Sequence, residues 1–219
     1  MRLDQADQLL EPGYLPFESG YLRLDDGQIH VAAQTTMPGC KGAMIDWWFG
    51  FLETTEQYKW WHPKDHVRCE RAGERGTGRG ARQVRGDTPG GEHHVHEFIG
   101  GGLMKLKIRF REPSEYLDTS RFAEAGVSTA VCARVGALEA PVWAGHLIHL
   151  VRDTDYGCEM RSRFWLGDYD PPEVAATREA RIALLPDRAG AGLLRHCQEE
   201  MGYLAAFLPR LHTQDTGRP

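Results

Sequence analysis

Five consecutive segments between residues 93 and 166 have the pattern of β-strands, and this run constrains the fold more than any other feature of the sequence. Each segment is bounded by Gly, Pro or Asp, which interrupt regular structure. The segments are His93–Ile99, Leu103–Arg111, Ser128–Val135, Val142–Arg152 and Glu159–Leu166. Successive strands of this kind predict an antiparallel sheet in the middle of the chain.

One amphipathic helix is predicted after the sheet. Its apolar residues recur at the three- and four-residue spacing of a helix face, and Pro209 is expected to end it. These residues are Leu193, Leu194, Cys197, Met201, Leu204, Ala205 and Leu208. Because a helix with one apolar stripe must bury it against another element, we expect an α+β domain in which a curved antiparallel sheet wraps around the long C-terminal helix.

The rest of the chain is expected to contribute shorter elements. Residues 21–31 predict a hairpin that turns at Asp26-Gly27, since this dipeptide accepts the positive φ of a tight turn. The aromatic-rich run 43–52 has helical spacing and predicts a helix. Residues 68–92 are rich in Arg and Gly with almost no large apolar side chain, which predicts a mobile surface loop. The predicted organisation is an N-terminal extension (1–20), one domain (21–209) and a flexible tail (210–219).

Composition narrows the class of protein. With 219 residues, of which 41% are hydrophobic, the chain is long enough for one domain with a sizeable core. A net charge of −5 gives no electrostatic reason to expect binding to nucleic acid or to an anionic membrane. We find no apolar leader and no membrane-length apolar segment, so we expect a cytoplasmic protein. The five cysteines are scattered without a Cys-x-x-Cys pair, which predicts reduced thiols.

Histidines and carboxylates occur in positions where they could share a metal ion. On the C-terminal helix, His196 and Glu200 are four residues apart and project from one face. A surface His–Glu pair within the helix is the alternative. Strand alternation places Glu97 on the inward face with Val95 and Ile99, where a buried carboxylate needs a partner. A metal ion and an arginine are equally compatible with that position.

Two more histidines, His62 and His66, lie in the segment 58–66. Pro63 breaks regular structure between them, so their four-residue spacing is no evidence of a shared helix face. Either one could be a metal ligand. Two histidines and two carboxylates from three separate segments would leave a coordination position open for water or a substrate oxygen, as catalytic zinc requires.

Four longer motifs carry a family resemblance. They are Met37-Pro38-Gly39, Met44-Ile45-Asp46-Trp47-Trp48-Phe49-Gly50, Tyr58-Lys59-x-Trp61-His62-Pro63-x-x-His66 and Met160-Arg161-Ser162-Arg163-Phe164-Trp165-Leu166-Gly167. The chain is similar to the diacetylphloroglucinol hydrolase family, which includes phloretin hydrolases, from about Gly20 to Leu208. The resemblance implies a Bet v 1-like helix-grip domain and zinc-dependent hydrolysis of an aryl ketone. Carried over by position, it makes His66 the ligand rather than His62, together with Glu97, His196 and Glu200.

The resemblance also places Tyr58 and a histidine of the segment 146–149 beside the substrate. His149 is favoured for substrate binding and catalysis, and His146 stays open because both faces of that strand carry apolar residues. Phe164 is expected to point inward, at a place where the resemblance suggests a tyrosine hydroxyl in relatives, and its loss would change which phenol is bound. The resemblance also implies additional N-terminal residues in relatives, associated with dimer contacts, and a homodimer is one expected state of the chain.

The function that we expect from the sequence is hydrolysis of the carbon–carbon bond between an acyl group and a phenolic ring. Zinc would activate water and the carbonyl. His149 is the candidate for proton delivery and Tyr58 for hydrogen bonding to a ring hydroxyl or a developing enolate. Two alternatives remain: a zinc-dependent polyketide cyclase or isomerase, and a non-catalytic protein that binds an aromatic ligand in a helix-grip cavity.

Overall fold

The structure is a computed structural model of the chain and describes residues 1–72 and 90–218. Within this part, eight strands form one antiparallel sheet in the order β1-β2-β8-β7-β6-β5-β4-β3. The strands are β1 (Gly20–Arg23), β2 (Ile29–Pro38), β3 (His66–Ala72), β4 (Glu92–Ile99), β5 (Gly102–Arg111), β6 (Val127–Ala137), β7 (Val142–Thr154) and β8 (Gly157–Asp170). The predicted hairpin and all five predicted strands are confirmed.

The helices lie mainly at the two ends of the chain. The α-helices are α1 (Gly42–Phe51), α2 (Thr55–Trp61), α3 (Arg178–Leu184) and α4 (Arg188–Thr216). Short 3-10 helices occupy η1 (Leu3–Leu10), η2 (Pro113–Glu115), η3 (Thr119–Arg121) and η4 (Pro172–Ala175). Helix α1 confirms the helix predicted for the aromatic-rich run. In the described residues no helix is both long and apolar enough to span a membrane.

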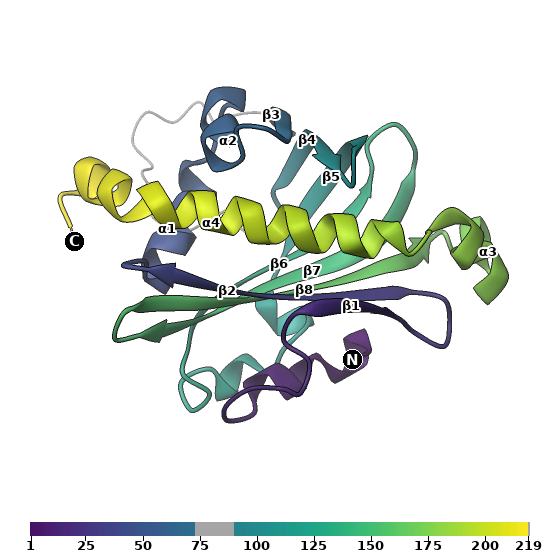
Figure 1. Cartoon of the computed structure of the whole chain (residues 1–219), viewed down its shortest axis with the longest axis horizontal. Coiled ribbons are helices and arrows are strands. Elements are labelled where there is room, and N and C mark those ends of the chain that lie inside the picture. The colour runs from purple at the N-terminus through teal and green to yellow at the C-terminus, as the bar shows by residue number, and fades with distance from the viewer. Residues whose placement is uncertain (73–89, 219) are drawn as a thin grey trace.

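Helix α4 lies along one face of the curved sheet, as Figure 1 shows, and packs against β1, β2, β4, α1 and α2. Its residues Met201, Leu204 and Leu208 are fully buried in one apolar core with sheet residues such as Val31 and Met160. This is the α+β helix-grip architecture that we expected, with the long C-terminal helix held by the sheet. We call the face of the sheet that carries this core the inner face.

The outer face of the sheet is also covered. Leu9 and Leu10 of η1 pack against Ile148, Leu150 and Trp165 in a second apolar core on the side away from α4 (Figure 1). On the same side, the carboxylate of Glu18 pairs with two buried arginines of β8, Arg161 and Arg163. The N-terminal segment therefore shields the outer face, and the central strands β7 and β8 are buried on both sides.

The C-terminal helix does not end at Pro209, as we had predicted, but continues to Thr216. Proline has no N–H to donate to the carbonyl of Ala205, and the thiol of Cys40 lies 4.0 Å from that oxygen. Beyond the proline, the ring of His212 packs edge-on against Trp47 at 5.3 Å. The indole of Trp47 also donates to Asp215 at 3.3 Å. These tertiary contacts hold residues 210–216 in the helix, where a flexible tail was expected.

The loop predicted for residues 68–92 is wrong at both of its ends. Residues 68–72 belong to β3 and pair with β4, so that the start of this segment is regular structure. Residue 92 begins β4. The polar composition misled the prediction because β3 is an edge strand with mostly exposed side chains, which need not be apolar. Residues 73–89 lie outside the described part of the chain.

Candidate metal centre

Three elements bring four buried histidine and glutamate side chains together. His66 begins β3 and lies opposite Glu97 of β4, while His196 and Glu200 are one turn apart on α4. The Nε2 atom of His66 is 3.5 Å from Oε2 of both Glu97 and Glu200. The Nε2 atom of His196 is 3.4 Å from Oε2 of Glu97 and 3.9 Å from that of Glu200. The structure thus gathers all four residues predicted as metal ligands.

Hydrogen bonds fix the orientation of both imidazole rings. His66 Nδ1 lies 2.9 Å from the backbone carbonyl oxygen of Tyr58, which can only accept, so this nitrogen carries the proton. His196 Nδ1 lies 3.3 Å from Oδ2 of Asp65 and donates to it. In both rings Nε2 is therefore the nitrogen that faces the glutamates. Neither Nε2 atom has a hydrogen-bond partner in the described structure, although both are buried.

The charges of the cluster would suit a bound cation. Burial raises the pKa of Glu97, but His196, His66 and Tyr58 outweigh it and hold that pKa at about 2. Burial lowers the pKa of His196, yet its contact with Glu97 and the charges of Glu200 and Glu97 raise it to about 9. Without an ion, the carboxylates thus retain a proton on His196. A divalent cation would displace that proton, because a ligating imidazole must be neutral.

The donor set fits zinc by its chemistry. Imidazole nitrogens and carboxylate oxygens are the ligands of catalytic zinc sites. Ligand atoms of His66, His196 and Glu200 lie within 4.8 Å of one another, and so do those of His62, Asp65 and His196. His62 and Asp65 are therefore a second set of candidate donors beside the first, and the assignment of ligands remains a prediction.

Tyr58 lies directly against the cluster. Its hydroxyl donates to Oε2 of Glu97 at 2.7 Å, and its ring stacks on His66 with centroids 3.7 Å apart. Burial, followed by the charge of Glu97, raises the pKa of Tyr58 well above its ordinary value, so the hydroxyl stays protonated. Tyr58 consequently orients one candidate ligand through its hydroxyl and packs on another through its ring.

His149 lies on the inner face of β7, with Leu147 and Val151 of the inner core. Its ring stacks with Phe49 at 6.2 Å and meets Phe164 edge-on at 5.7 Å. Its Nδ1 is 2.7 Å from Oγ of Ser162. Burial lowers the pKa of His149 to about 4, with the charge of Glu200 acting in the opposite direction. The side chain is thus a neutral imidazole at pH 7. Phe164 also points inward, as expected.

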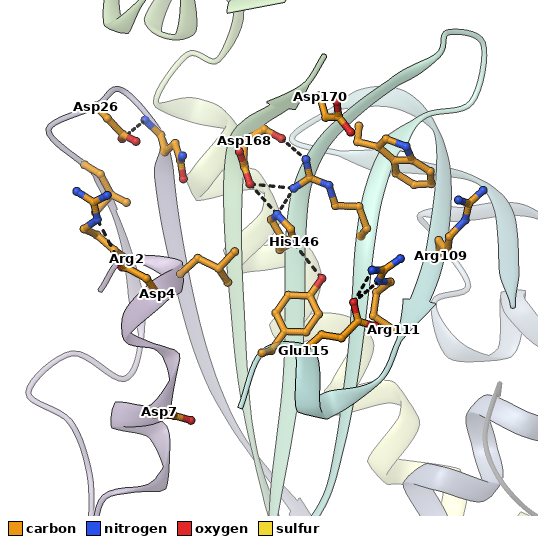
Figure 2. A pocket seen from close by; sticks show the side chains of 16 residues that line it. Arg2, Asp4, Asp7, Asp26, Arg109, Arg111, Glu115, His146, Asp168 and Asp170 are labelled. Carbon is orange, nitrogen blue, oxygen red and sulfur yellow. Dashed lines mark hydrogen bonds and ion pairs between the residues drawn. The ribbon is translucent and has the colours of Figure 1, made fainter. Parts of the chain in front are cut away.

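His146 lies on the opposite side of the same strand, away from the cluster. It lines an open cavity of about 840 Å³ on the outer face, which Figure 2 shows from close by. Its Nε2 is 2.7 Å from Asp168 and its Nδ1 is 2.9 Å from the hydroxyl of Tyr116, with Arg134 beside it. The structure therefore does not bring His146 to the other predicted site residues.

Three polar partners of the site were not identified from the sequence. Asp65 contacts His196, Ser162 contacts His149, and Glu199 lies 3.5 Å from Nε2 of His62. Asp65 directly precedes a predicted ligand and Glu199 directly precedes another, which is a weak signal because neighbouring residues usually point in different directions. Ser162 stands within a quoted motif, but only strand pairing reveals that it faces His149.

Comparison with known proteins agrees with the motifs. The chain matches the family described as the DAPG hydrolase PhiG domain over residues 1–213. A 2,4-diacetylphloroglucinol hydrolase from Pseudomonas sp. is 27% identical over 224 residues, covering 97% of this chain and 76% of the relative. The phloretin hydrolase of Eubacterium ramulus is 30% identical over 196 residues, covering 87% and 69%. The crystal structure of protein Ms6760 from Mycobacterium smegmatis aligns with a TM-score of 0.49 and 12% identity, over 89% of this chain and 99% of that one.

The fold and the buried cluster define a helix-grip protein with histidine and carboxylate groups suited to a metal ion. The chain belongs to the DAPG hydrolase PhiG domain family. The family predicted from the motifs is confirmed, and so is the expectation that the chain is an enzyme of the hydrolase class.

Proposed function

We propose that this protein is a zinc-dependent hydrolase that cleaves the carbon–carbon bond between an acyl group and a phenolic, phloroglucinol-like ring. The products are a carboxylic acid and the deacylated phenol. The observation that carries the proposal is the convergence of two imidazole Nε2 atoms and two carboxylates in a buried cluster. The printed names of the relatives, a diacetylphloroglucinol hydrolase and a phloretin hydrolase, support the substrate class.

His66, Glu97, His196 and Glu200 would hold the ion. Zinc bound there would polarise the acyl carbonyl and lower the pKa of a bound water toward about 7. Tyr58 keeps Glu97 oriented by donating to its Oε2 atom. Because that proton is committed to the carboxylate, the oxygen of Tyr58 offers lone pairs to a ring hydroxyl of the substrate. This assigns Tyr58 a role in orienting both a ligand and the phenol.

The reaction adds water across the bond between the ring and the acyl carbon. The hydroxyl of water joins the acyl carbon, and the electron pair of the broken bond passes from the ring carbon to the phenolate oxygen. In the keto tautomer of the phenol that carbon is sp3, so departure of the acyl group restores the aromatic ring. The second proton of water neutralises that phenolate, whereas the ring carbon receives its proton earlier, from a ring hydroxyl, when the keto tautomer forms.

His149 is the group proposed to move this proton. Its pKa of about 4 leaves the ring neutral at pH 7, so it has no extra proton to give at the start of the reaction. It must therefore accept the proton of a ring hydroxyl before it delivers one to the ring carbon, and it acts first as a base and then as an acid. Ser162 holds the Nδ1 side of the imidazole during both steps.

The aromatic side chains around His149 suit a phenolic ring. Phe49 and Phe164 contact His149 on the inner face, and Phe110 packs against Phe49 at 6.0 Å. These three side chains carry no hydroxyl, so that the ring would be held by apolar contact and oriented by Tyr58 and the metal centre. Phe164 in particular offers no hydrogen bond to a ring substituent.

The test is to incubate zinc-loaded protein with mono- and diacylphloroglucinols in ¹⁸O-labelled water and to analyse the products by mass spectrometry. The proposal expects the deacylated phenol and a carboxylic acid that carries one labelled oxygen. The His66→Ala variant, treated identically, is the control for metal-independent breakdown. A product of unchanged mass would indicate a cyclase or isomerase, and recovery of unaltered ligand bound to the protein would indicate a carrier; either result refutes hydrolysis.

A further inference from the structure

We propose that Asp65 is a positioning residue that fixes His196 for metal binding, and that His62 holds Asp65 in place rather than ligating the metal. This inference rests on the proposed metal site. It goes beyond the four ligands because it assigns the adjacent group of His62, Asp65 and His196 a supporting role instead of a second ion.

Asp65 links the three elements of the site. It lies in the turn between α2 and β3, and its carboxylate accepts from Nδ1 of His196 on α4 at 3.3 Å. Its backbone carbonyl accepts from the N–H of Phe98, the residue after Glu97 on β4, at 2.9 Å. One residue thus ties the helix that carries His196 to the strand that carries Glu97.

The hydrogen bond from His196 to Asp65 decides which nitrogen is available. A neutral imidazole carries its proton on either nitrogen, and only the unprotonated one can bind a metal. A carboxylate at Nδ1 favours the proton there and leaves the lone pair on Nε2, which faces Glu97 and Glu200. It also holds the ring orientation and makes Nε2 more basic.

In His62 the protonated nitrogen is Nε2, not Nδ1. The backbone N–H of Asp65 donates to Nδ1 of His62 at 3.1 Å, so this nitrogen is the acceptor and Nε2 carries the proton. That Nε2 atom is fully buried and lies 3.5 Å from both Asp65 Oδ2 and Glu199 Oε2. A metal ion on Nε2 would require loss of either this proton or the backbone hydrogen bond. His62 therefore faces two carboxylates as a donor.

The packing of His62 agrees with a supporting role. Its ring lies parallel to that of His196, with centroids 4.9 Å apart and planes inclined by 4°. The ring of Tyr203 also contacts it, with centroids 5.2 Å apart. His62 thus packs against two residues of α4 and limits the rotation of the His196 ring, while its edges contact Asp65.

The experiment measures zinc affinity by competition with a chromophoric chelator, with Co²⁺ absorption as a second readout of the ligand set. Asp65→Ala should weaken zinc binding by about 10–100-fold, the usual effect of removing such a partner. Asp65→Asn should lose less, because its amide oxygen still accepts from Nδ1. Glu56→Gln is the matched control: it removes an exposed carboxylate from α2 and should leave affinity unchanged.

A pair of histidine variants tests the second half of the inference. His62→Asn supplies an acceptor oxygen in place of Nδ1 and should keep zinc affinity within about 10-fold of wild type, with the Co²⁺ spectrum unchanged. His66→Asn removes a ligand and should abolish tight binding. Circular dichroism of each metal-free variant verifies that the fold is retained.

The outcomes separate this inference from the metal site itself. Wild-type affinity in both Asp65 variants, or loss of zinc from His62→Asn as complete as that from His66→Asn, overturns the inference and leaves the metal site standing. Failure of the wild-type protein to bind zinc refutes the site and the inference together.

Discussion

Replacing His149 by Gln tests whether the buried imidazole moves the proton. Glutamine keeps a polar end that can bond to Ser162 but does not titrate, and its size limits the cavity that is left. General acid–base groups contribute about 10²–10⁴-fold, so kcat of the zinc-loaded variant should fall by that factor. The His146→Gln variant, altered on the outer face of the same strand, should keep its turnover.

The structure also predicts how the pH dependence of stability differs between wild type and His149→Gln. Burial lowers the pKa of His149 from 6.5 to about 4, so the unfolded chain binds this proton more readily than the folded one between these values. Stability is therefore lost as the pH falls from 6.5 to 4, by about 3 kcal/mol at 1.36 kcal/mol per pKa unit. Because the glutamine side chain of His149→Gln does not titrate, this part of the acid-induced loss should disappear from the variant.

Urea unfolding of wild type and variant at pH 7 and pH 4, together with kcat measured on zinc-loaded protein, provides both readouts. Near-normal turnover of His149→Gln would refute its catalytic role, and so would a loss of turnover confined to His146→Gln. If the two proteins lose the same stability between pH 7 and pH 4, then His149 is not the buried neutral imidazole described above.

Three further predictions concern the metal, the tyrosine and the helix end. Purified protein should hold one zinc per chain and His196→Ala should lose most of it, which elemental analysis measures. Tyr58→Phe keeps the ring stack but removes a hydrogen bond to the charged Glu97, so the metal-free variant should be about 1.5–3 kcal/mol less stable in urea unfolding; an unchanged midpoint would contradict this geometry. Deleting residues 210–219 removes partners of Trp47, and should lower the melting temperature and shift the Trp emission to longer wavelength; unchanged values would show that these contacts contribute nothing.

The elements of the fold could be predicted where the sequence pattern is local. Strand ends marked by Gly, Pro or Asp and the apolar stripe of α4 are visible in short windows, and both were found. The end of α4 was not, because contacts with Trp47 and Cys40, remote in sequence, sustain the helix past Pro209. Taken alone, Pro209 favours a helix end, but tertiary packing overrides this local preference.

In the site, too, some residues could be predicted from local spacing and others depend on tertiary structure. His196 and Glu200 could be paired from helical spacing, whereas the partnership of His66 with Glu97 depends on the register of β3 against β4. The choice between His146 and His149 could not be made by alternation. The N-terminal segment covers the outer face of β7, so that apolar residues occur on both sides of that strand. Only the packing of residues far away in the chain distinguishes them.

The distribution of the four candidate ligands over β3, β4 and α4 has a consequence for assembly. Among the described strands, β3 with His66 is at the edge of the sheet and pairs with β4 alone, while His196 belongs to α4 near the C-terminus. An ion bound between them would act as a cross-link that closes most of the polypeptide into a loop, in the manner of a disulfide formed late in folding. Docking of α4 against the sheet and binding of the metal would then be one cooperative event, and the ion proposed for catalysis would also fasten the edge strand β3.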